Sequence, residues 1–247
     1  MPGNQERPDP PAALEEAVER LRRDGVNVNS EMRRCFETHK ALIREWNPFA
    51  SLVSSGDIAE LDTRHLVDSL SLVPSVLAAC RNGGTVPQAS RPDGTVAQAS
   101  RVHSTLLDIG SGGGFPAVPI KAVLPELELV MVERSSRRVA FLRKVTAASN
   151  LAGVRIVNGN FPENLDIDID TGICAITARA VEKPGELARR LVPFLEAGAV
   201  YICQSESAKQ ALESAAFHVE HVRDQWVPRG LRRGELYLIS AVDARRT

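Results

Sequence analysis

Residues 105–117 read TLLDIGSGGGFPA, and the rest of the chain is arranged around them. The apolar run 105–109 is typical of a short buried strand. The glycines that follow form a turn without Cβ atoms, in which the backbone can adopt positive φ and approach a ligand closely. Pro116 suits the first turn of a following helix, where its missing N–H is no loss. Strand, glycine turn and helix together predict a nucleotide-type cofactor site at the carboxyl end of a parallel strand.

The glycine turn fits two cofactor patterns. Gly112-x-Gly114-x-x-Ala117 satisfies the dinucleotide pattern, so a nicotinamide or flavin site is allowed. In the other register, Gly110-x-Gly112-x-Gly114 follows Asp108. This carboxylate would repel a pyrophosphate in a partly dry site, but it would attract the ammonium group of S-adenosylmethionine.

A second acid, Glu133, ends the next apolar run, LELVMVE at 127–133. Its carboxylate can accept hydrogen bonds from both hydroxyls of a ribose. Asp108 and Glu133 together favour S-adenosylmethionine over NAD as the cofactor.

The length and charge of the chain limit the possible classes of function. With 247 residues, the chain forms one sizeable domain, or one domain with an appendage. Since 30 Lys and Arg stand against 31 Asp and Glu, nucleic-acid binding would require a local basic patch. One candidate patch lies at 133–144 and a second, rich in arginine, at 223–247; either could equally be a solvated surface. The basic residues of the first are Arg134, Arg137, Arg138, Arg143 and Lys144.

The cysteines are scattered and contain no C-x-x-C pair, so neither a zinc site nor a disulfide framework is indicated. We expect no metal. Without a signal peptide or an apolar run of membrane length, we expect a soluble, cytoplasmic protein that does not contact membranes. We expect it to be a monomer. The cysteines are Cys35, Cys80, Cys174 and Cys203.

The first part of the chain is predicted to be a helical extension over residues 11–80. Residues 1–10 are polar and rich in proline, so we expect a disordered tail. A first helix is predicted over 12–24. A second begins with Ser30 as N-cap, carries a buried stripe at helical spacing, and ends at Asn47-Pro48.

A third helix is predicted from Asp57 or Asp62 to about residue 80. Its residues His65, Asp68 and Ser69 stand at i, i+3 and i+4, so they share one face. Three polar groups on an otherwise apolar helix could be a structural hydrogen-bond cluster or a recognition surface beside the cofactor, and the spacing alone allows both.

The segment 81–103 differs in composition from its neighbours. GTVPQASR at 84–91 recurs as GTVAQASR at 94–101, and neither copy has an apolar face to bury. We interpret it as a low-complexity insertion or linker, and expect 84–101 to be dispensable for stability and activity.

From residue 104 to 247 the pattern alternates between strands and helices. This alternation predicts an α/β, Rossmann-like domain with a mostly parallel seven-stranded sheet. The last two strands have no crossover helix between them, so they must pair antiparallel, as in S-adenosylmethionine methyltransferases. The predicted strands are 105–109, 127–133, 153–157, 173–178, 198–204, 216–223 and 235–242. The predicted helices are 116–123, 136–149, 184–195 and 206–215.

With these elements placed, the sequence resembles the RsmG family, once called glucose-inhibited division protein B. The resemblance covers roughly residues 30–80 and 104–242. It implies an S-adenosylmethionine-dependent enzyme that methylates N7 of a guanine in the 530 loop of 16S ribosomal RNA, within the small subunit or its precursor. The matching stretches are EWNPFASL, RHLVDSL, LLDIGSGGGFPAVPIK, VERSSRRVAFL and TARAV.

The resemblance adds roles to the residues already singled out. It implies that Glu133 holds the ribose, that Phe161 and Pro162 lie beside the adenine, and that Arg179 lies between cofactor and target. The expected cofactor-binding residues are Asp108, Gly110, Gly112, Gly114, Phe115, Glu133, Phe161, Pro162 and Arg179. The expected catalytic residues are Arg179, His65 and Asp68, and the expected RNA-binding residues are Arg137, Arg138 and Ser69.

The chain departs from the family pattern at three places that concern target recognition more than the cofactor. Ser51-Leu52-Val53 stands where the family often has Asn-Leu-Thr, and Ala117 where it has Gly. Gln204-Ser205 replaces a Lys-Gly pair. A methyltransferase acting on a small molecule, an NAD(P) oxidoreductase and a non-catalytic RNA-binding relative therefore remain open.

Overall fold

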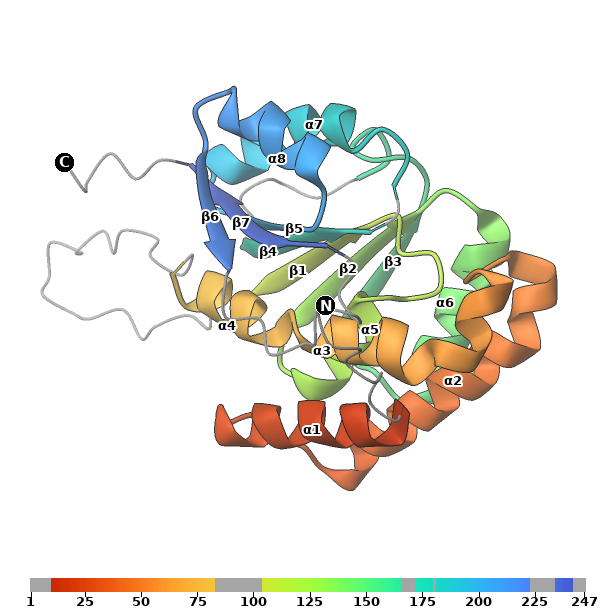
Figure 1. The fold of residues 1–247 in the computed structure, drawn as a ribbon. Helices are drawn as coiled ribbons and strands as arrows, with labels where there is room; N and C mark the ends of the chain where they lie inside the picture. Colours follow the sequence, from red (N-terminus) through yellow and green to blue (C-terminus); the bar gives the residue numbers. More distant parts are fainter. Residues whose placement is uncertain (1–9, 83–103, 166–171, 180, 223–233, 242–247) are drawn as a thin grey trace, which may run out of the picture.

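A seven-stranded sheet lies between two layers of helices (Figure 1). The computed structural model describes residues 10–82, 104–165, 172–179, 181–222 and 234–241. The strands are β1 (Thr105–Ile109), β2 (Glu128–Glu133), β3 (Val154–Asn158), β4 (Ile173–Ala178), β5 (Val200–Cys203), β6 (His218–Val222) and β7 (Leu236–Ser240). The helices are α1 (Pro10–Arg23), α2 (Ser30–Ala50), α3 (Asp68–Leu70), α4 (Val73–Asn82), α5 (Ala117–Val123), α6 (Ser136–Ala148), α7 (Pro184–Glu196) and α8 (Glu206–Glu213).

The strand order in the sheet is β3-β2-β1-β4-β5-β7-β6. All neighbouring strands run parallel except at β7, which pairs antiparallel with β5 and with β6. The predicted fold class, a mostly parallel seven-stranded sheet whose last strand is antiparallel, is confirmed.

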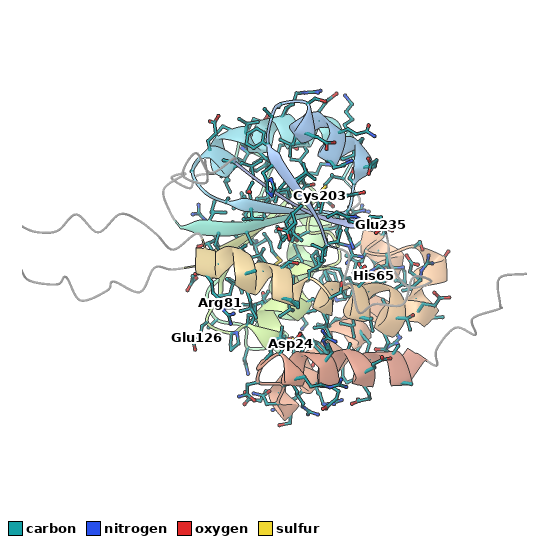
Figure 2. The ribbon with its side chains drawn as sticks, turned by 60° about the vertical axis from the view of Figure 1, so that its left-hand side comes forward. Asp24, His65, Arg81, Glu126, Cys203 and Glu235 are labelled. Atoms are coloured by element: carbon teal, nitrogen blue, oxygen red, sulfur yellow. A yellow bond between two sulfur atoms is a disulfide. The ribbon has the colours of Figure 1, made fainter. Side chains whose placement is uncertain are left out.

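Alternate residues of the central strands fill two separate cores. Leu106 and Met131 face the N-terminal helices together with α5 and α6. Leu107 and Val130 face α7 and α8 on the other side. This is the two-residue period of a strand buried on both faces. In the turned view, Asp24, His65 and Arg81 lie on the side of the N-terminal helices (Figure 2).

The second helix begins one residue earlier than predicted. Asn29 is the N-cap, and its side chain accepts a hydrogen bond from the N–H of Met32. Ser30 is therefore the first helical residue, and the prediction of Ser30 as the cap is wrong. Asn is at least as good an N-cap residue as Ser, so the sequence alone does not distinguish Asn29 from Ser30.

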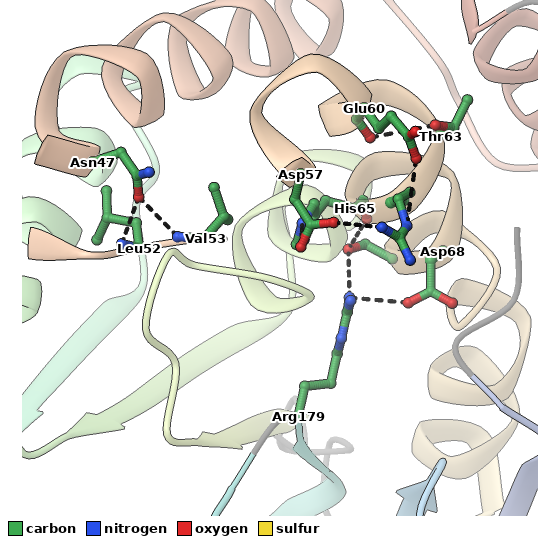
Figure 3. A network of polar contacts seen from close by, with 11 residues as sticks. Asn47, Leu52, Val53, Asp57, Glu60, Thr63, His65, Asp68 and Arg179 are labelled. Carbon is green, nitrogen blue, oxygen red and sulfur yellow. Dashed lines mark hydrogen bonds and ion pairs between the residues drawn. The ribbon is translucent and has the colours of Figure 1, made fainter. Parts of the chain in front are cut away.

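The same helix also continues past Asn47-Pro48 to Ala50, so the predicted end is wrong. Its C-cap, Ser51, has φ 49°. Proline removes one helical N–H. Beyond the helix end, the side chain of Asn47 accepts the N–H groups of Leu52 (2.7 Å) and Val53 (2.9 Å) (Figure 3).

The predicted third helix is broken into four pieces. A 3-10 turn (Ser55–Glu60), a π-helical segment (Leu61–Val67), α3 and α4 follow one another. The hydroxyl of Ser69 donates to the carbonyl of His65 at 2.5 Å, and Pro74 enters the first turn of α4. Both features disturb a regular helical hydrogen-bond ladder.

Cys80 of α4 and Cys174 of β4 form a disulfide, contrary to the expectation that the cysteines are unpaired. The two residues are 94 positions apart, but α4 packs against β4 and brings their Cα atoms within 4.8 Å. Sequence spacing alone carries no sign of such a pair. Cys35 and Cys203 are free and buried.

Two expected borders of the helical extension differ from the described helices. α1 begins at Pro10, inside the predicted disordered tail of residues 1–10, and α4 reaches Asn82 rather than residue 80. The rest of the predicted tail, residues 1–9, and the repeat at 84–101 lie outside the described residues. Within the described ranges, no helix is both long and apolar enough to cross a membrane.

His39 fixes the helical extension to the glycine turn. It lies on α2, is fully buried, and its Nε2 donates to the carbonyl oxygen of Gly113 at 2.7 Å. Its ring stacks on Phe115 with ring centroids 4.4 Å apart. Gly113 itself has little room for a side chain, because an added Cβ would lie 3.1 Å from the carbonyl oxygen of Leu52. The turn is therefore built against α2.

This contact predicts a pH-dependent stability. Burial lowers the pKa of His39 from 6.5 to about 4, so between these values the unfolded chain binds a proton that the folded chain excludes. The stabilisation is complete above pH 6.5 and is lost as the pH falls toward 4, by about 3 kcal/mol in total. Denaturant unfolding at several pH values, compared with His39→Gln, measures this loss.

Asp108 titrates in the same range with the opposite sign, because burial raises its pKa from 3.8 to about 6. Its contribution is present at low pH and is lost as the pH rises through about 6. Since the unchanged protein and His39→Gln both keep Asp108, the difference between their unfolding free energies reports the imidazole alone. A difference in unfolding free energy that stays constant from pH 4 to 7 would contradict the assignment.

Candidate cofactor site and target pocket

The site lies where the winding of the sheet changes direction. From β1 the chain proceeds to β2 on one side, while β4 lies on the other, and Ile109 pairs with Ala178. The carboxyl ends of β1 and β4 therefore place Gly110 and Arg179 next to each other. Such a switch point is where open α/β sheets bind their ligands.

The glycine turn is bonded to the end of β2. Gly110 and Gly112 have φ values of 73° and 52°, which other residues adopt at a cost. The N–H of Gly112 donates to Oε2 of Glu133 at 2.9 Å, and the N–H of Ser135 donates to Oε1 at 2.8 Å. Each carboxylate oxygen can accept a second hydrogen bond, so Glu133 can hold the turn and still accept a ribose hydroxyl.

A cavity of about 750 Å³ opens beside this turn. Its lining includes three of the expected cofactor residues, Gly110, Glu133 and Phe161. The ring of Phe161 packs on that of Phe194, with ring centroids 5.5 Å apart, and this contact fixes the position of Phe161. The volume and the mixed polar and apolar walls suit a nucleoside-sized ligand.

The sequence patterns did not predict several residues that line the cavity. Asn160 could have been predicted, because it follows β3 and the carboxyl ends of parallel strands meet at one edge of the sheet. The others are charged residues of loops and of α7, for which the sequence offers no comparable signal. They include Glu163, Glu182, Lys183, Glu186 and Arg190.

Asp108 is almost fully buried at the end of β1 and is not among the cavity-lining residues. Its Oδ1 accepts from the hydroxyl of Thr177 at 2.7 Å, while its Oδ2 has no hydrogen-bond partner among the described residues. Burial raises the pKa of this carboxyl to about 6. A buried oxygen without a donor is costly, and an ammonium group would satisfy it. The site thus fits the amino acid part of S-adenosylmethionine.

Three further expected cofactor residues do not line the cavity. Gly114 and Phe115 support the turn: a Cβ at Gly114 would lie 2.8 Å from Val118, and the ring of Phe115 contacts those of His39 and His65. Pro162, outside the turn, is half-buried, and its carbonyl accepts the N–H of Leu165.

Arg179 joins the sheet to the helical extension. Its Nη1 lies 3.1 Å from Oδ2 of Asp68 and 3.4 Å from the hydroxyl of Ser69 (Figure 3). Gln204, at the end of β5, donates to the other oxygen of Asp68 at 3.2 Å. The side chains of Arg179 and Asp68 are only 10% and 2% exposed, so their ion pair is largely shielded from water.

His65 lies three positions before Asp68, in the π-helical segment, but has different neighbours. Its Nε2 lies 3.4 Å from Oδ2 of Asp57, and its ring centroid lies 4.7 Å from that of Phe115. Asp57 also accepts from Arg64 at 2.8 Å. The structure thus brings His65, Asp68 and Arg179 to one region, as expected, and adds Asp57. Sequence patterns did not predict Asp57 as a site residue, because it lies eight positions before His65, in the 3-10 turn rather than in the π-helical segment.

Two arginines expected to bind RNA contact the last turn of α2. Arg138 donates to the carbonyls of Ala50 (3.3 Å) and Ser51 (3.0 Å), and Arg137 donates to that of Phe49 (3.5 Å). Arginines at a helix C-terminus satisfy its carbonyls and its dipole. Arg138 therefore has structural contacts that an RNA-binding role does not require. It also lines the cavity.

Comparison with known families agrees with this geometry. Residues 95–233, more than half of the chain, match the family described as GidB, rRNA small subunit methyltransferase G. The chain belongs to this family. Within the described residues, no group of three or more His, Cys, Asp or Glu side chains is arranged to hold a metal ion.

Individual relatives carry the same family name. The ribosomal RNA small subunit methyltransferase G of Lachnoclostridium phytofermentans is 27% identical over 205 residues, 82% of this chain and 76% of the relative. That of Acetivibrio thermocellus is 27% identical over 212 residues, 83% of this chain and 78% of the relative. A Podospora anserina methyltransferase, whose crystal structure is SAH-bound, has a TM-score of 0.50 at 15% identity and 98% coverage of both chains. That structure supports the fold.

The glycine turn predicts selective cofactor binding. Calorimetry should detect S-adenosylmethionine binding to the intact chain, and Gly112→Val should abolish it, because a β-branched residue resists the φ of 52° at this position. Binding should also raise the melting temperature, since the ligand stabilises only the folded state.

Gly56→Val is the matched control, because Gly56 is exposed, has ordinary φ, and a Cβ there meets nothing within 4 Å. The control should bind as the unchanged chain does. Binding of NADH in place of S-adenosylmethionine would instead favour the dinucleotide register.

Proposed function

We propose that this protein transfers the methyl group of S-adenosylmethionine to N7 of a guanine in the 530 loop of 16S ribosomal RNA. The observation that carries the proposal is the position of Arg179. It follows the end of β4, next to the end of β1 from which the glycine turn begins, and it contacts Asp68 and Ser69 of the extension, so one residue lies between the turn and a buried polar cluster.

The chain supplies groups of the right chemistry for each part of the cofactor. Asp108 offers a buried carboxylate oxygen to the ammonium, Glu133 accepts from the ribose, and Phe161 provides an apolar surface for the adenine. When bound, S-adenosylmethionine supplies a methyl group on a positively charged sulfur.

The target atom makes few demands on the protein. N7 of guanine carries a lone pair and no proton at neutral pH, so its methylation requires no general base. The residues of the pocket then act by holding the base in line with the methyl group. Arg179, with donors in a fixed fork, suits guanine O6 or a phosphate.

In this proposal His65 is a positioning residue. Asp57 and the ring of Phe115 hold its imidazole beside the turn that carries the cofactor. Asp68 positions Arg179 through their buried ion pair, and Gln204 holds the other oxygen of Asp68.

The absence of a general base predicts a flat pH profile. The single-turnover rate should change little over roughly pH 6.5 to 8.5, where a histidine base would titrate. His65→Asn should retain partial activity, whereas Arg179→Ala should lose about tenfold to a hundredfold with less change in cofactor affinity. A rate that rises tenfold per pH unit and vanishes in His65→Asn would contradict N7 as the target.

Removing Arg179 also leaves Asp68 buried without its partner, which can destabilise the fold. Arg179→Ala combined with Asp68→Asn removes that charge, and the loss of rate should persist in this double variant. Arg179→Lys keeps the charge but not the fork, so it should restore folding more than activity.

We further propose that the protein acts as a cytoplasmic monomer on the small subunit or its precursor. The exposed residues Arg137 and Lys144 are seven positions apart and share one face of α6, which suits contact with phosphates. Arg143 is exposed on the same helix.

This surface predicts salt-dependent RNA binding. Affinity for 16S rRNA should fall as salt rises, and replacing Arg137 and Lys144 by Ala should weaken binding and reduce the salt slope by about two. Arg23→Ala, an exposed change on α1, is the control and should have no effect. Salt-independent activity with both residues dispensable would indicate a small-molecule substrate.

A further inference from the structure

Phe49 is an aromatic side chain displayed to solvent near the cofactor cavity. It lies in the last turn of α2 and is 71% exposed, more than any other large apolar residue in the described ranges. An isolated exposed apolar residue needs no explanation by itself. What distinguishes Phe49 is its backbone and its charged surroundings.

The backbone around Phe49 is held on both sides. Arg137 donates to the carbonyl of Phe49, and Arg138 donates to the next two carbonyls. On the other side, Asn47 accepts the N–H groups of the two residues that follow the C-cap (Figure 3). A side chain on so fixed a support loses little freedom when it binds a partner.

The charges beside Phe49 favour an anionic partner. Arg137 donates to its carbonyl, and Arg44 is exposed five positions earlier on α2. The nearest acid along the helix is Glu45, exposed four positions before Phe49. An aromatic ring among arginines is the composition of a single-stranded nucleic-acid surface.

Arg138 connects this surface to the cofactor cavity, because it lines the cavity and also binds the turn that follows Phe49. α2 and α6 lie side by side where this contact forms (Figure 1). A nucleotide on Phe49 would therefore lie near this cavity.

We propose that Phe49 stacks on an unpaired base of the RNA substrate, close to the methylated guanine. This inference rests on the proposed function, since it assigns part of the RNA surface of that enzyme. Stacking uses the π-face that every base presents, so it holds the strand without reading its sequence.

The test compares variants at this one position in methylation of small subunits. Phe49→Ala should raise KM for RNA about tenfold without changing S-adenosylmethionine affinity or melting temperature. Phe49→Trp and Phe49→Tyr should keep KM near that of the unchanged chain. Phe49→Leu, which is apolar but has no ring, should behave like Phe49→Ala.

An unchanged KM in Phe49→Ala would overturn the inference, and so would full rescue by Phe49→Leu, which would indicate an aliphatic contact with a protein of the subunit. Binding is also measured without catalysis: fluorescence of Phe49→Trp, referenced to the unchanged chain, should be quenched by a single-stranded RNA oligonucleotide. Absent quenching overturns the inference, whereas quenching without methylation would refute only the proposed function.

Discussion

The hydrogen bond between His39 and Gly113 joins the two parts of the molecule that make the site. It connects α2 to the third glycine of the turn, and the stacked ring of Phe115 extends the contact toward His65. Burial keeps the imidazole neutral, and because a carbonyl oxygen can only accept, Nε2 carries the proton and gives the turn a fixed partner inside the core. The glycine turn thus owes its shape to the helical extension as well as to its own sequence.

The extension is consequently part of the functional site. Arg179 and Gln204 reach from the ends of β4 and β5 to Asp68, and Arg138 reaches from α6 to the end of α2. These buried or half-buried polar contacts surround the switch point of the sheet. A cofactor bound on one side and a base held on the other would meet between them, which is the arrangement a methyl transfer requires.

Much of the fold follows from local sequence patterns. The central strands bury both faces and helices alternate with the strands, so their order and the antiparallel pairing of the last strand could be predicted. The acids at the ends of β1 and β2 indicated the cofactor class for a similar reason, since parallel strands bring their carboxyl ends to one edge. The disulfide could not be predicted, because it joins residues 94 positions apart. His39 was assigned to a buried stripe, but its partner Gly113 lies 74 residues away.

The most direct test of the account is to locate the methyl group. Small subunits that lack the modification would be incubated with the purified protein and S-adenosylmethionine, and the RNA digested and sequenced by mass spectrometry. If the proposed activity is correct, the RNA will contain a single new 7-methylguanine, in the 530 loop of 16S rRNA. Methylation of another atom or another RNA region, or no incorporation into RNA at all by a protein that binds the cofactor, would contradict it.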